Sequence, residues 1–151
     1  MWYPLPAHSV IRLIIAGGRD FVSSESDIEK LYGTNWNIMC HTMELWRSQF
    51  GMPNFVLCGM ALGADLMGKH WADCANIEVL KYPAAWRVDG EYNPLAGIER
   101  NTEMADNATH LIAFWDGKST GTADMIKKAR NRGLHVTVIY YNRPKPIKTL
   151  F

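Results

Sequence analysis

Three short segments of the chain combine glycine with polar side chains, each where an apolar run of strand length ends. They are Gly17-Gly-Arg-Asp20, Gly59-Met-Ala-Leu-Gly-Ala-Asp65 and Asp116-Gly-Lys-Ser-Thr-Gly-Thr122. Glycine lets the backbone approach a ligand closely, and the free N–H groups and dipole of a helix start favour an anionic oxygen. Phosphate is the usual anion at such a junction. The three segments together therefore indicate a site for a nucleotide or a nucleotide-derived small molecule.

Each of the side chains near these segments has a possible structural role as well as a possible role in ligand binding. Arg19 is suited to a bidentate contact with phosphate, or to an ion pair with a nearby aspartate. Asp65 and Asp116 are suited to a ribose hydroxyl, although a helix dipole or a turn also accounts for a carboxylate there. Trp86 could cover a base or anchor its loop in the core. The candidate ligand-binding residues are Gly17, Gly18, Arg19, Asp20, Gly59, Ala61, Gly63, Asp65, Trp86, Arg100, Asn101, Ser119, Gly121 and Thr122.

Strands and helices must bring these positions together. Apolar runs predict strands at 10–16, 54–58, 77–82, 110–115 and 134–141. Helical spacing predicts helices ending near residue 49 and spanning about 64–75, 94–107 and 121–132, with 84–94 a loop. Strands that alternate with helices form parallel βαβ units. We therefore expect an α/β, Rossmann-like three-layer sandwich with a mainly parallel sheet of about five strands.

A single domain is expected at 10–141, between an N-terminal arm at 1–9 and a C-terminal tail at 142–151 that leaves the fold. In open α/β sheets ligands bind beyond the carboxyl ends of the strands, near a reversal of strand order. The three glycine segments would open on that edge. Their spacing is neither G-x-G-x-x-G nor that of a P-loop, so no NAD-type coenzyme or other cofactor is predicted.

Composition narrows the classes of partner. The 151 residues carry a net charge of +1 and are 48% hydrophobic. This composition is typical of a globular domain, and the nearly neutral charge argues against a nucleic-acid partner. Three cysteines lack metal-type spacing and favour buried free thiols in a reducing cytoplasm, with no metal site. No run is long enough for a membrane helix and no signal-peptide pattern is present, so no membrane contact is expected. Trp2 and Tyr3 of the arm favour a homo-oligomer.

Five ordered motifs resemble a known family. Ile-Ile-Ala-Gly-Gly-Arg-Asp-Phe, Cys-Gly-Met-Ala-Leu-Gly-Ala-Asp, Tyr-Pro-Ala-Ala-Trp, Ala-Gly-Ile-Glu-Arg-Asn-Thr-Glu-Met and Ile-Ala-Phe-Trp-Asp-Gly-Lys-Ser-Thr-Gly-Thr-Ala-Asp-Met-Ile follow one another over residues 10–140. In this order they resemble the YspA-like (cpYpsA-related) group of the SLOG superfamily, the Rossmannoid clan that contains LOG proteins and DprA. Many members of the group occur in bacteria and phages. The resemblance implies a nucleotide-derived ligand on the glycine segments, bound by a sensor or sink for a signalling nucleotide.

The same clan implies two alternative functions. LOG enzymes hydrolyse the N-glycosidic bond of nucleoside monophosphates with an arginine and a glutamate. Arg100 matches the arginine, but Met125 occupies the position of the glutamate, so an enzyme of this kind would need Asp124 or Asp116 as its carboxylate. Leu62 replaces the arginine that the group usually has before Gly-Ala-Asp. DprA binds single-stranded DNA, and the basic run at 127–132 is the corresponding candidate surface here, unless it is simply the solvated face of a helix.

Overall fold

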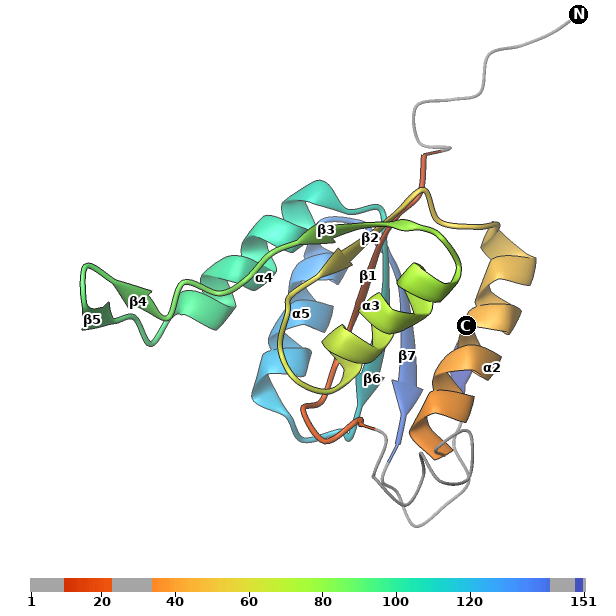
Figure 1. The fold of residues 1–151 in the computed structure, drawn as a ribbon, viewed down its shortest axis with the longest axis horizontal. Helices are drawn as coiled ribbons and strands as arrows, with labels where there is room; N and C mark the ends of the chain where they lie inside the picture. The colour runs from red at the N-terminus through yellow and green to blue at the C-terminus, as the bar shows by residue number, and fades with distance from the viewer. Residues whose placement is uncertain (1–9, 23–33, 142–148, 151) are drawn as a thin grey trace, which may run out of the picture.

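A six-stranded sheet forms the centre of the molecule in the computed structural model, which describes residues 10–22, 34–141 and 149–150 (Figure 1). Its strands are β1 (Arg12–Gly17), β2 (Phe55–Cys58), β3 (Glu78–Lys81), β6 (His110–Trp115), β7 (His135–Tyr140) and β8 (Thr149–Leu150). The described helices are α2 (Thr34–Phe50), α3 (Ala64–Cys74), α4 (Ala96–Asn107) and α5 (Thr120–Asn131).

The strand order is β3-β2-β1-β6-β7-β8, and the first five strands are parallel. From β1 the chain proceeds outward through β2 to β3, and then crosses back to place β6 on the other side of β1. The order therefore reverses between β1 and β6. In open, doubly wound sheets, ligands bind at the position where the strand order reverses.

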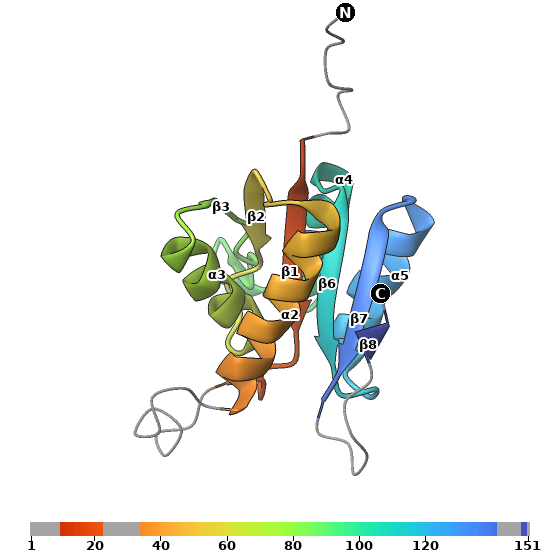
Figure 2. The same ribbon diagram turned by 90° about the vertical axis from the view of Figure 1, so that its right-hand side faces the viewer.

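Successive side chains of β1 face opposite sides of the sheet, and each side has its own helices (Figure 2). Leu13 and Ile15 pack in the core cluster that contains residues of α2 and α3. Ile14 and Ala16 pack in the cluster that contains residues of α4 and α5. All four side chains are buried, which explains why β1 is apolar throughout rather than alternating. The predicted three-layer α/β sandwich with a mainly parallel sheet is confirmed.

The segment predicted as a loop at 84–94 contains a β-hairpin, which corrects the prediction. Strands β4 (Arg87–Val88) and β5 (Glu91–Tyr92) pair antiparallel, and the hairpin projects from the body between β3 and α4 (Figure 1). Asp89 and Gly90 form its turn with φ values of 50° and 81°. Positive φ at both central residues is typical of the Asp-Gly hairpin turn, a signal present in the sequence.

The C-terminal tail was expected to leave the fold, but its end returns to the sheet. β8 pairs antiparallel with β7, so that Val138 lies opposite Leu150. This strand shields the otherwise open edge of β7. The predicted N-terminal arm at 1–9, and any helix before residue 34, lie outside the described residues. None of the described helices is both long enough and apolar enough to cross a membrane.

Candidate functional site

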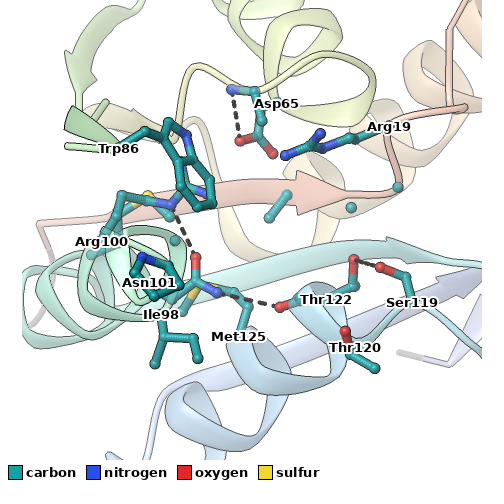
Figure 3. A pocket seen from close by; sticks show the side chains of 18 residues that line it. Arg19, Asp65, Trp86, Ile98, Arg100, Asn101, Ser119, Thr120, Thr122 and Met125 are labelled. Atoms are coloured by element: carbon teal, nitrogen blue, oxygen red, sulfur yellow. Dashed lines mark hydrogen bonds between the residues drawn. The ribbon is translucent and has the colours of Figure 1, made fainter. Parts of the chain in front are cut away.

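A cavity of about 430 Å³ lies beyond the carboxyl ends of β1 and β6, where the strand order reverses (Figure 3). We call it the larger cavity. Its volume is in the range usual for small-molecule sites. It is lined by Ala16, Gly17, Gly18, Arg19, Ala61, Asp65, Trp86, Pro94, Gly97, Ile98, Arg100, Asn101, Met104, Ser119, Thr120, Gly121, Thr122 and Met125.

The N-terminus of α5 forms one side of the larger cavity. Ser119 occupies the position before the helix, and its side chain does not cap the helix. The first backbone bond of the helix runs from Ala123 N to Ser119 O at 3.1 Å, and the N–H groups of residues 120–122 have no partner among the described residues. Thr122 is buried and its hydroxyl donates to Ser119 Oγ. This end of the cavity offers free donors and a positive dipole to an anion.

Asp116 and Asp124, the two carboxylates expected for an enzyme, do not line the cavity. Asp116 Oδ1 accepts hydrogen bonds from the N–H groups of Lys118 and Ser119, both at 2.8 Å. These bonds lower the pKa of Asp116, and they hold the turn before α5. Asp124 Oδ2 accepts from Asn101 Nδ2 at 3.1 Å and from Lys128 Nζ at 2.9 Å. Both carboxylates are therefore used in local structure.

Asp65 is the carboxylate that the larger cavity does contain. Its residue is only 5% exposed, on the first turn of α3. Burial raises the pKa of Asp65 from its ordinary value of 3.8 to about 6, while Arg100, the N–H groups of Ala61 and Gly17, and Arg19 act in the opposite direction. Desolvation is thus only partly offset by the surrounding donors. A ligand that brings a hydroxyl or another donor to Asp65 would complete the compensation.

Gly59 separates Asp65 from Arg100. A Cβ at residue 59 would lie 2.6 Å from Asp65 Oδ2 and 2.7 Å from Arg100 Nη1, so any larger residue would displace one of them. Within the described part of the chain the two groups form no ion pair. Arg100 is instead held by bonds from Nη1 to Gly59 O and from Nε to Asn101 Oδ1. Its guanidinium keeps further N–H groups for a ligand.

A second cavity, of about 260 Å³, adjoins the first. We call it the smaller cavity. It is lined by Arg19, Gly59, Met60, Ala61, Leu62, Pro83, Ala84, Trp86 and Arg100. Arg19, Ala61, Trp86 and Arg100 line both cavities, so these residues form the boundary between them.

Trp86 stands at this boundary as a partly exposed side chain. It is 37% exposed, and its outer side stacks on Tyr92 of the hairpin with ring centroids 6.1 Å apart and planes 10° apart. Its indole also approaches Gly97 of α4, where an added Cβ would lie 3.3 Å from Cη2. Trp86 is therefore held by the hairpin and α4 rather than in the core, and part of its ring faces the cavities.

Loop contacts keep the first two glycine segments together. Gly18 O accepts hydrogen bonds from Ala64 N at 3.1 Å and from Phe21 N at 3.2 Å. Gly63, with φ of 91°, lies so close that a Cβ there would be 2.1 Å from Gly18 O. Asp20 Oδ1 accepts a 2.5 Å bond from Tyr141 Oη beyond the end of β7. Gly63 and Asp20 line neither cavity. Their contacts instead hold the first two glycine segments in place.

The structure brings most of the candidate ligand-binding residues into one place. Gly59 lines the smaller cavity only, and the others, apart from Asp20 and Gly63, line the larger one. Sequence reasoning missed part of the wall and floor, namely Ala16, Pro94, Gly97, Ile98, Met104, Thr120 and Met125. Met104 and Met125 are buried core residues that also line the larger cavity. Of the missed residues, only Thr120 could have been identified from the sequence, because it lies inside the third glycine segment.

The cysteines differ in exposure, which corrects the expectation that all three are buried. Cys58 is buried, Cys40 is intermediate and Cys74 is exposed, and all three are free. Burial raises the pKa of the Cys58 thiol to about 11, so it remains protonated at neutral pH. The described residues contain no cluster of three or more His, Cys, Asp or Glu side chains suited to a metal ion.

No known family model matches the chain, and no curated protein is significantly similar to it.

Proposed function

We propose that this protein binds a phosphorylated, nucleotide-derived small molecule in the larger cavity. The observation that carries the proposal is the combination found there: free N–H groups of α5, the guanidinium groups of Arg19 and Arg100, and the buried carboxylate of Asp65 around one space of about 430 Å³. The first two suit phosphate oxygens, and the last suits a ribose hydroxyl. The resemblance to the YspA-like group of SLOG proteins points the same way, and we propose membership of that group.

The alternative of an N-glycosidic hydrolase is less well supported. Such an enzyme needs a carboxylate beside the sugar. Asp116 and Asp124 are held in local hydrogen bonds, and Asp65 is the carboxylate that lines the cavity. A hydrolase of this chain would therefore depend on Asp65 together with Arg100.

The alternative of a single-stranded DNA-binding surface on α5 also loses support. Lys128 Nζ is 2.9 Å from Asp124 Oδ2, and Arg132 Nε is 2.5 Å from Asp106 Oδ1. Two of the basic side chains in the 127–132 run are therefore neutralised by neighbours. The basic run therefore retains little net positive charge with which to bind a polyanion such as DNA.

A ligand screen tests the proposal. Purified protein would be titrated with AMP, ADP, ADP-ribose and NAD, with binding measured by thermal shift and calorimetry. Arg19→Ala is expected to weaken binding about tenfold, because it removes a charged phosphate contact. Arg130→Ala is the matched control, since Arg130 is an exposed arginine of α5 that lines neither cavity.

Mass spectrometry of the recovered ligand then separates binding from turnover. Intact ligand identifies a binding protein, and released base identifies a hydrolase. No binding of any of the four compounds by the wild-type protein would refute the proposal. Equal loss of affinity in Arg19→Ala and Arg130→Ala would show that the compounds bind elsewhere.

A further inference from the structure

The two cavities lie in series along one path. The N-terminus of α5 lines the larger cavity and not the smaller one. Arg19 and Arg100 line both, so they stand between α5 and the smaller cavity. A molecule that extends from α5 into the smaller cavity must therefore pass the two guanidinium groups.

Positive charge is thus available at two successive positions. The α5 N-terminus supplies the first, through its dipole and free N–H groups. The two arginines supply the second, and Asp65 faces them from α3 as the one carboxylate in either lining. Two guanidinium groups against one carboxylate leave a net positive charge there. A ligand with two linked phosphoryl groups would place an anion at each of the two positions, whereas a single phosphate would occupy one.

The smaller cavity beyond the arginines has a different character. Apart from the boundary residues, its walls are Gly59, Met60, Leu62, Pro83 and Ala84, none of which carries a charged side chain. Trp86 adds an aromatic surface. Met60 holds a positive φ of 62°, an unfavourable conformation for a residue with a side chain, and strain of this kind concentrates at ligand sites. Beyond the arginines the side chains are uncharged and one wall is aromatic, which suits a planar base that stacks through its face and hydrogen-bonds through its edges.

We propose, building on the proposed function, that the ligand is a nucleoside diphosphate or a derivative of one, bound with its diphosphate between α5 and the two arginines and its nucleoside in the smaller cavity. The affinity then has two separable parts. Inorganic pyrophosphate uses only the larger cavity. ADP and ADP-ribose use both, and AMP satisfies one anion position only.

Filling the smaller cavity tests this assignment. Ala84 lines it and is half-buried, whereas the neighbouring Ala85 is exposed and lines neither cavity. Ala84→Phe is expected to weaken ADP and ADP-ribose about tenfold or more in calorimetry while leaving pyrophosphate unchanged. Ala85→Phe is the matched control and should change none of the three. Wild-type protein should bind ADP more tightly than AMP.

A second variant guards against misfolding of the first. Met60→Gly relieves the positive φ and removes one wall of the smaller cavity, so it should fold and still lose affinity for ADP but not for pyrophosphate. Equal ADP affinity in wild-type, Ala84→Phe and Met60→Gly proteins would overturn the assignment while leaving the proposed function intact. Tighter AMP than ADP binding would overturn it as well. Failure of the wild-type protein to bind any nucleotide would refute the proposed function and this inference with it.

Discussion

At the scale of single residues, Asp65 has the most unusual environment in the cavity. The residue is nearly inaccessible to solvent. Its negative charge is compensated by backbone N–H groups and by two arginines that form no ion pair with it. A buried carboxylate in this condition favours its protonated form. The fold therefore becomes less stable as Asp65 ionises, and a ligand that supplies a donor would recover part of that free energy.

This state of Asp65 predicts an unusual dependence of stability on pH. Its folded pKa of about 6 exceeds the ordinary 3.8, so the folded protein binds more protons than the unfolded chain between these values. The free energy of unfolding should fall as pH rises from 4 to 6, by about 2 kcal/mol for this group. Asp65→Asn should lack this component. Urea denaturation of both proteins at pH 4, 5, 6 and 7 measures the difference, and parallel pH profiles would contradict the prediction.

At the scale of elements, Asn101 joins α4 to α5. The residue is 7% exposed, and its amide donates to Gly121 O at 3.3 Å and to Asp124 Oδ2 at 3.1 Å while its carbonyl accepts from Arg100 Nε. One side chain thus fixes the start of α5, the position of Asp124 and the direction of Arg100. The same amide therefore positions the helix that carries Arg100 and the helix whose N-terminus borders the larger cavity.

Replacement of Asn101 should affect both stability and binding. Asn101→Leu leaves Gly121 O and Arg100 Nε without this partner and is expected to lower the free energy of unfolding by about 1–3 kcal/mol. Thr102→Leu is a suitable control, since Thr102 is the neighbouring residue on α4 and lines neither cavity. Chemical denaturation and ADP titration measure the two effects. Wild-type affinity for ADP in Asn101→Leu would show that Arg100 does not need this support.

At the scale of the whole molecule, a contact between residues far apart in the chain supports the loop after β1. Tyr141, beyond β7, donates to Asp20, in the loop after β1, and its phenol ring also packs against Phe21 with centroids 4.9 Å apart. Burial, followed by the bond to Asp20, raises the pKa of Tyr141, so the phenol remains a donor at physiological pH. This contact ties the last parallel strand to the first glycine segment.

Removal of that hydroxyl should loosen the first segment. Tyr141→Phe keeps the ring and deletes the hydrogen bond to a carboxylate, which is expected to cost about 1.5–3 kcal/mol. Hydrogen exchange should increase at the amides of residues 18–21 in particular. Tyr140→Phe provides a comparison at the adjacent residue. Unchanged exchange at 18–21 together with unchanged stability would show that the contact has no energetic role.

The sequence predicts much of this molecule because its signals are local. Continuous apolar runs identified the five parallel strands, and the glycine segments contain half of the residues that line the larger cavity. The sequence could not predict which carboxylates face the cavity, because that depends on how side chains of different helices and strands pack together. In the sequence Asp116 and Asp124 look as available as Asp65. Lys128 follows Asp124 by four residues on α5, but only the packing of α4 on α5 shows that Asn101 also engages Asp124. The hairpin was missed although Asp89-Gly90 signals it.

The position of β1 has a consequence for how the chain folds. β1 pairs with β2 and also with β6, where Gly17 lies opposite Phe114. During synthesis the first half of the chain emerges long before β6 exists, so β1 then has one open edge. Pairings between distant segments also slow folding. The sheet and the site at its edge therefore cannot assemble until most of the polypeptide has left the ribosome, and truncated products ending before β6 would expose an apolar strand to aggregation.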